Sequence, residues 1–157
     1  MMTTLVAAAV VVLTAVVSAA QGRPDFSGEW VLNRAASTLS PGADSVESGV
    51  WRIEHREPLF RHQATLVFRG GKPLSYQYEL RSDGGEVVGD DRGARMISML
   101  GWDGATLVFT TRTVRAGGET TVSYRYEIIG GGSRLRATER VRGADHDQDN
   151  VWMFDRR

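Results

Sequence analysis

From Ser27 to the end of the chain, apolar and polar residues alternate with a period of two. Strict alternation over short runs is typical of half-buried β-strands and not of helices. Turns rich in Gly and Asp separate the runs, and these residue types accept the positive φ that tight hairpins require. The pattern predicts strands at residues 27–33, 49–57, 60–68, 73–81, 95–101, 106–114, 120–129, 134–142 and 150–155.

Successive hairpins of this kind form a meander in which each strand pairs with the next one along the chain. A sheet of many strands with one apolar face tends to close, because closure removes the exposed strand edges. We therefore expect an all-β fold, an antiparallel up-and-down meander that closes into a barrel of about 8–10 strands. A chain of 157 residues is long enough for one such domain.

Residues 34–48 break the alternation, because they are rich in Ser, Ala, Gly and Asp. We interpret this segment as a long loop or a short helix over one end of the barrel. Two roles stay open for it, a plain connection or a lid across the barrel mouth.

The N-terminal segment has the pattern of a signal peptide. Residues 5–17 are almost all Val, Ala and Leu, and this run is shorter than the roughly 20 residues that span a bilayer. Ser18, Ala19 and Ala20 follow it and suit signal peptidase. We expect residues 1–20 to be removed near Ala20, which leaves a secreted or periplasmic domain of residues 21–157 with no membrane span. The alternative is an uncleaved anchor, since no Lys or Arg precedes the run.

Composition excludes several classes of protein. The chain has no Cys, so no disulfide framework stabilises it. The 19 basic and 19 acidic residues balance and form no block of one sign. Nucleic-acid binding needs a basic excess, so we expect no nucleic-acid partner.

The start of the expected domain reads Phe-Ser-Gly-Glu-Trp-Val-Leu-Asn over residues 26–33. This motif resembles the Gly-x-Trp strand that begins lipocalins and related calycin barrels, and also small secreted bacterial proteins described as lipocalin-like. Residues 53–58 and 152–156 resemble segments of the same group. The resemblance implies a lipocalin-like barrel in which Gly28 and Trp30 close one end. It also implies that Arg156 or Arg157 packs over the indole, as a cation–π contact.

Alternation also predicts which side chains face the lumen. If residues 57–60 form a hairpin turn, Trp51 lies opposite Leu66, Ile53 opposite Ala64 and His55 opposite His62. Both histidines then share the apolar face, because alternate side chains point to one side of a strand. The same count extended to later strands gives these candidate ligand-binding residues: Trp51, His55, His62, Tyr76, Tyr78, Phe109, Tyr124, Tyr126 and Glu139.

An apolar and aromatic interior with a few polar groups is the usual lining of a small-molecule site. We therefore predict an exported, monomeric barrel that holds a small apolar or amphipathic molecule. In the alternative, tyrosines simply fill the core with their hydroxyls at a rim. Such a filled barrel would be an envelope or partner-binding protein, for which Val108, Val114 and Ile129 offer an exposed apolar patch.

Enzymatic chemistry is a further alternative, with His55, His62 and Glu139 as the candidate acids and bases. Imidazole titrates near neutrality, and burial raises the pKa of a carboxyl group. The same three groups could also bind a metal, but we predict no metal or other cofactor. Residues 145–149 resemble the start of a calcium loop but lack its later Gly and Glu, so we interpret them as a hairpin turn.

Overall fold

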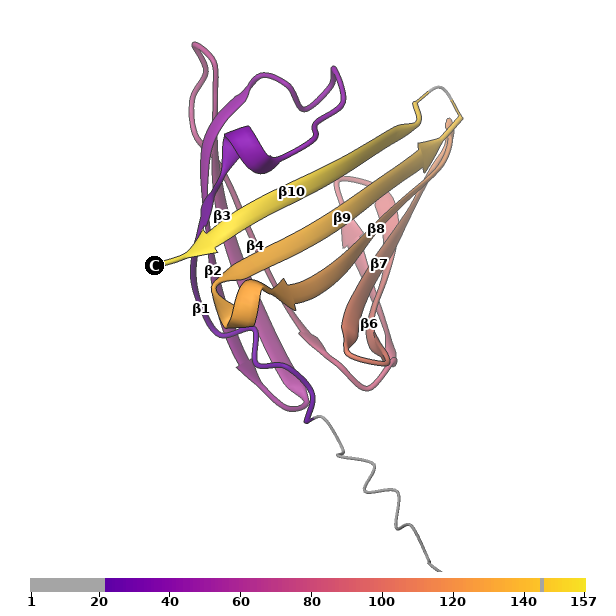
Figure 1. The fold of residues 1–157 in the computed structure, drawn as a ribbon. Coiled ribbons are helices and arrows are strands. Elements are labelled where there is room, and N and C mark those ends of the chain that lie inside the picture. The colour runs from indigo at the N-terminus through magenta and orange to yellow at the C-terminus, as the bar shows by residue number, and fades with distance from the viewer. Residues whose placement is uncertain (1–21, 145) are drawn as a thin grey trace, which may run out of the picture.

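Ten antiparallel strands and two short 3-10 helices make up the structure, a computed structural model that describes residues 22–144 and 146–157 (Figure 1). The expected signal peptide therefore lies outside the described residues. The 3-10 helices are η1 (Arg34–Ala36) and η2 (Gly130–Gly132). The strands are β1 (Gly28–Leu32), β2 (Val46–Arg56), β3 (Leu59–Phe68), β4 (Leu74–Arg81), β5 (Glu86–Asp91), β6 (Ala94–Asp103), β7 (Thr106–Arg115), β8 (Gly118–Ile129), β9 (Arg134–Gly143) and β10 (Gln148–Arg156).

The strands form one sheet in the order β4-β3-β2-β1-β10-β9-β8-β7-β6-β5. Every strand pairs with its neighbour along the chain except β4 and β5, and β1 pairs with β10. The sheet curls so that β4 approaches β6, where the backbone N–H of Gly84 donates to the carbonyl of Leu100 at 2.9 Å. The all-β, up-and-down, nearly closed barrel is confirmed.

β5 is the one strand that the alternation missed. It is an edge strand that pairs only with β6, and all six of its residues are exposed. Without a buried face, its sequence does not show the alternation of apolar and polar residues that identified the other strands. Gly89, Asp90 and Asp91 also resemble turn residues. Burial pattern thus identifies strands that cover the core but not a polar edge strand.

The turn between β2 and β3 lies one residue earlier than predicted. It consists of Glu57 and Pro58, whose peptide bond is cis, and Arg56 pairs with Leu59. Trp51 therefore lies opposite Ala64, Ile53 opposite His62 and His55 opposite Phe60. The predicted turn is one residue late in the chain. This shifts every predicted pair of β2 and β3 by two residues, so the predicted register was wrong. A shift of two keeps each side chain on its face, so both histidines are buried as predicted.

The described chain begins at one end of the barrel (Figure 1), and side chains close this end. Trp30 is fully buried, and its indole N–H donates to the carbonyl of Phe26 at 2.9 Å. The Arg156 guanidinium lies 4.2 Å from the centre of the Trp30 ring. Gly28 has a φ of +143°, and a Cβ on it would lie 3.0 Å from Nη1 of Arg156. The positive φ favours glycine at this position, and a Cβ would also push the Arg156 guanidinium aside by a few tenths of an ångström.

Residues 33–46 cross the opposite end of the barrel (Figure 1). After η1 the segment has no helix, and Thr38 forms a two-way backbone bridge with Val151 of β10. The Ser37 hydroxyl accepts from the backbone N–H of Met153 at 2.9 Å. These bonds fix the segment against β10.

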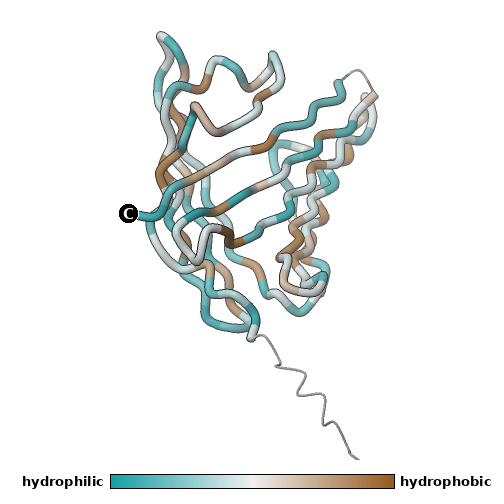
Figure 2. Tube along the Cα trace, in the orientation of Figure 1, coloured by the Kyte–Doolittle hydropathy of each residue, from teal (hydrophilic) through white to brown (hydrophobic). Residues whose placement is uncertain are grey.

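Hydrophobic and hydrophilic residues alternate along the strands (Figure 2). The buried side is a single cluster that includes Trp30, Trp51, Phe60 and Phe154. Trp51 and Phe154 lie 4.0 Å apart between ring centres. No helix within residues 22–144 and 146–157 is long and apolar enough to cross a membrane.

Candidate ligand cavity

A cavity of about 640 Å³ occupies the half of the barrel that lies under residues 42–46. Its walls come from β3 to β10, together with Gly42, Ala43 and Val46 of the crossing segment. Val87 and Gly89 of the edge strand β5 also line it. The cavity therefore reaches the unpaired seam between β4 and β5.

Seven aromatic residues line the cavity. Tyr78 stacks on Phe109 with ring centres 4.8 Å apart, and Tyr124 stacks on Tyr126 at 5.6 Å. The hydroxyls of Tyr78 and Tyr126 hydrogen-bond each other at 3.0 Å. Burial raises the pKa of Tyr76, Tyr78, Tyr124 and Tyr126 above the ordinary value. All four are therefore neutral phenols at physiological pH.

Glu139 lines the cavity and is the one buried carboxylate among the described residues, and its side chain is held by three donors. Oε2 accepts from Nδ2 of Asn150 at 2.6 Å and from the Trp152 indole N–H at 2.9 Å. Oε1 accepts from the Tyr124 hydroxyl. Only 7 % of the residue is exposed, so these bonds replace the water that the carboxylate loses on burial.

Asn150 and Trp152 were not among the predicted site residues. Both point inward from β10, and Asn150 is 1 % exposed. Oδ1 of Asn150 also accepts from the backbone N–H of Ser40 at 2.7 Å. The sequence does carry a signal for Asn150, because alternation places it on the same apolar face as Trp152 and Phe154, where a polar residue is unusual. Asn150 thus connects Glu139 to the crossing segment.

His62 lies behind the cavity wall and not on its surface. It is 1 % exposed, and its ring contacts Trp51 at 4.7 Å and Tyr78 at 5.0 Å between ring centres. Neither ring nitrogen has a hydrogen-bond partner among the described residues. Burial lowers the pKa of His62 to about 3, so the ring is neutral over the physiological range.

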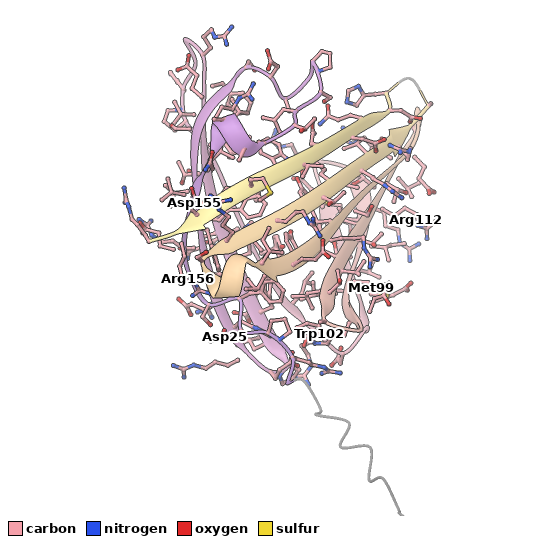
Figure 3. The ribbon with its side chains drawn as sticks, viewed as in Figure 1. Asp25, Met99, Trp102, Arg112, Asp155 and Arg156 are labelled. Carbon is pink, nitrogen blue, oxygen red and sulfur yellow. The ribbon has the colours of Figure 1, made fainter. Side chains whose placement is uncertain are left out.

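His55 lies at the closed end of the barrel. Its Nδ1 accepts from the backbone N–H of Phe26 at 3.3 Å, and its Nε2 bonds Oε1 of Glu57 at 3.0 Å. Glu57 also accepts from the Trp102 indole at 2.7 Å and from the Ser82 hydroxyl at 2.7 Å. Burial raises the pKa of Glu57, but these hydrogen bonds outweigh it and hold the pKa below the ordinary value. Figure 3 labels Trp102 and Asp25 at this end.

The structure therefore brings together only part of the predicted site. Trp51, His55 and His62 do not line the cavity, and the ring of Phe60 contacts both histidines from between them. Among the described residues, His55, His62 and Glu139 share no hydrogen-bond partner, so these three groups do not converge on one acid–base site. No group of three His, Cys, Asp or Glu side chains within the described residues could hold a metal ion. The predicted residues that do line the cavity are Tyr76, Tyr78, Phe109, Tyr124, Tyr126 and Glu139.

The most exposed apolar residues differ from the outer-wall patch that was predicted. Val108 and Ile129 are half-buried, and Val114 is exposed. The large apolar residues with the most exposure are Leu74, Val87 and Val88, at 50 %, 51 % and 53 %. They lie on β4 and β5 beside the open seam. The most exposed apolar side chains thus lie beside the opening of the cavity.

The predicted hairpin turn at residues 145–149 is only partly a turn: His146 and Asp147 lie between β9 and β10, whereas Gln148 and Asp149 are paired residues of β10. Asp145 lies outside the described residues. Oδ1 of Asp147 accepts from the backbone N–H of Gly143 at 3.4 Å. The Asp147 carboxylate therefore bonds the backbone at the connection between β9 and β10.

Comparison with known proteins supports the fold. No protein-family model matches the sequence, and no curated protein matches it either. A point mutant of the fluorescent protein UnaG is 20 % identical with a TM-score of 0.56, over 84 % of this chain and 96 % of that one. A secretory abundant heat soluble protein from Ramazzottius varieornatus is 12 % identical with a TM-score of 0.59, over 84 % and 95 %.

Zebrafish ileal bile acid-binding protein, complexed with cholic acid, is a third similar structure. It is 14 % identical with a TM-score of 0.52, over 84 % of this chain and 98 % of that one. These likenesses cover nearly the whole of each solved chain and concern the barrel as a whole. They support the barrel that the lipocalin-like resemblance implied, and this architecture is not specific to lipocalins. What this chain shares with these proteins is therefore its fold, a nearly closed antiparallel β-barrel.

Proposed function

We propose that this protein is an exported carrier that holds a small apolar or amphipathic molecule in its barrel. The observation that carries the proposal is the cavity of about 640 Å³ with a largely aromatic and apolar wall. Its volume falls within the range of about 300–1,000 Å³ that is usual for small-molecule sites. A barrel with a filled core has no such space.

The polar groups of the wall are few and fixed, as in a site that orients its ligand. Tyr78 and Tyr126 bond each other, and Glu139 is held by Asn150 and Trp152. The similar fold of the bile acid-binding protein, which was solved with cholic acid, supports a lumenal ligand of this general kind. Tyr76, Tyr78, Phe109, Tyr124 and Tyr126 are the proposed contact residues.

Export and the monomeric state are also part of the proposal. The apolar run at residues 5–17, followed by Ser18-Ala19-Ala20, supports cleavage near Ala20. Intact mass spectrometry of the protein purified from its native source should then give a chain that begins at Gln21. A mass that includes residues 1–20 would indicate a retained anchor instead.

Ligand binding is tested with the protein extracted gently from its native source. Native mass spectrometry should show a co-purifying small molecule, and delipidated protein should bind Nile red, an uncharged apolar dye, with a rise in dye fluorescence. A protein that carries no compound and does not bind the dye would contradict the proposed function.

A further inference from the structure

We infer that the cavity selects a cationic amphiphile, an apolar body with an ammonium or similar head group, over a carboxylate lipid. This inference rests on the proposed binding function and names its ligand class. It follows from the charges, the aromatic faces and the free acceptor position of the cavity wall.

The first observation is the sign of the charge inside the barrel. Glu139 is the only Asp, Glu, Lys or Arg that is buried in the part of the chain that the structure describes. No Lys, Arg or His side chain of that part lines the cavity. Arg136 and Arg125, on the outer face of the sheet, pair with Glu127 and Asp103.

The rim of the cavity adds no net charge to that of Glu139. Glu79, on β4 at the rim, pairs with Arg61 at 2.6 Å. Asp90, on β5, lies directly opposite Arg95 of β6 in the sheet register. The charge that a ligand meets inside the barrel is therefore that of Glu139.

The basic group nearest to the wall does not offset this charge. His62 contacts Tyr76 and Tyr78 from behind, with ring centres 5.9 Å and 5.0 Å away. Its burial keeps the ring neutral at physiological pH. A ligand carboxylate would enter a space with a carboxylate and no cation, and burial of an unpaired charge is costly.

The aromatic wall favours a cation for a second, independent reason. The faces of Tyr and Phe rings carry negative potential, and a cation within about 6 Å of a ring centre is attracted to them. The stacked pairs Tyr78–Phe109 and Tyr124–Tyr126 both border the cavity.

Glu139 also has an acceptor position to offer. Its Oε2 already accepts two hydrogen bonds, and its Oε1 accepts one, from Tyr124. A carboxylate oxygen has two lone-pair positions, so Oε1 retains one. An ammonium N–H of a ligand can donate to it, beside the phenol of Tyr124.

The test compares three probes with the same apolar chain: dodecylammonium, dodecanol and dodecanoate, each below its micelle concentration at neutral pH. We expect calorimetry on the delipidated protein to give dodecylammonium an affinity about tenfold above that of dodecanol, with dodecanoate the weakest. Equal or tighter binding of dodecanoate overturns the inference and leaves the proposed function intact. Failure of all three probes contradicts the proposed function itself.

The variant Glu139→Gln separates charge from structure. Its amide oxygen can still accept from Asn150 and Trp152, and its NH2 can donate to the Tyr124 hydroxyl. We expect an approximately tenfold loss of dodecylammonium affinity with dodecanol affinity unchanged. Glu127→Gln, on the outer face of β8, makes the same change in net charge and should leave all three affinities unchanged. Equal losses for all three probes in Glu139→Gln would show a merely structural role and overturn the inference.

Discussion

At the scale of single residues, His62 is the side chain most sensitive to pH. Its pKa is about 3 in the folded protein, against 6.5 in an unfolded chain, because burial disfavours the charged ring. Between these values the unfolded state binds a proton that the folded state does not. The free energy of unfolding therefore falls as pH drops below 6.5, by roughly 2 kcal/mol at pH 5. Urea denaturation at pH 5 and pH 8 measures this difference.

Replacement of His62 by Phe should remove this dependence. Phe keeps the ring contacts with Trp51 and Tyr78 and eliminates two buried nitrogens without partners. His146→Gln is the matched control, since His146 is exposed and its loss should leave the dependence on pH in place. The phenols that face His62 do not titrate between pH 5 and 8. An unchanged slope in His62→Phe would refute the assignment to His62.

The residues of the closed end were the most accessible to sequence reasoning. The positive φ at Gly28 favours glycine, and the Trp30 side chain fills the end of the barrel. The two residues are close together in the chain, so a short sequence motif could identify both. Arg156 lies next to Asp155 at the far end of the sequence (Figure 3), and only the pairing of β1 with β10 brings its guanidinium to Trp30. His55 was predicted to face the barrel interior, and it does, but it lies at the closed end and not beside the cavity. Alternation reports a side of the sheet and contains no information on position along the barrel axis.

At the scale of elements, the crossing segment of residues 33–46 depends on β10. Asn150 holds both Glu139 and the backbone of Ser40. Asn150→Ala removes a donor from a buried carboxylate and leaves the Ser40 N–H unpaired. We expect a loss of about 3 kcal/mol in the free energy of unfolding and faster proteolysis near Ser40. Chemical denaturation and limited proteolysis measure the two effects.

Thr38→Ala is the control for this change. Thr38 is exposed and bonds Val151 through its backbone, which Ala retains. A surface substitution of this kind should cost less than about 0.5 kcal/mol. Equal proteolysis of the two variants near Ser40 would show that Asn150 does not anchor the segment.

The elements divide into those that the pattern could predict and those that it could not. The strands that cover the core were recognised because each buries alternate side chains. β5 buries none, and the register at Pro58 depends on which turn position the proline occupies. Glu139 was recognised as a polar residue on an apolar face, whereas its partners come from β8 and β10 and required the sheet order. The alternation within a strand thus predicts which side chains face the barrel interior. Which of those side chains contact one another depends on the strand order and register of the sheet.

At the scale of the whole molecule, the barrel has one seam that backbone pairing does not close. β4 and β5 are both edge strands, and the cavity reaches Val87 and Gly89 on β5. Gly89 pairs with Met96, which also lines the cavity, so a side chain at residue 89 would point inward. A Cβ there meets no atom within 4 Å. We therefore expect Gly89→Trp to obstruct the seam without disturbing the fold.

Gly89→Trp should slow the association of Nile red about tenfold, because the indole occupies the opening through which the dye enters. Its free energy of unfolding should stay within about 0.5 kcal/mol of the parent protein, since the site is exposed. Stopped-flow fluorescence measures the association rate. Gly117→Trp, in the open turn between β7 and β8, introduces the same side chain away from the cavity and should leave the rate unchanged. Equal rates for the two variants would mean that ligands enter elsewhere, and the end covered by residues 42–46 would then be the route, because those residues form the other boundary of the cavity.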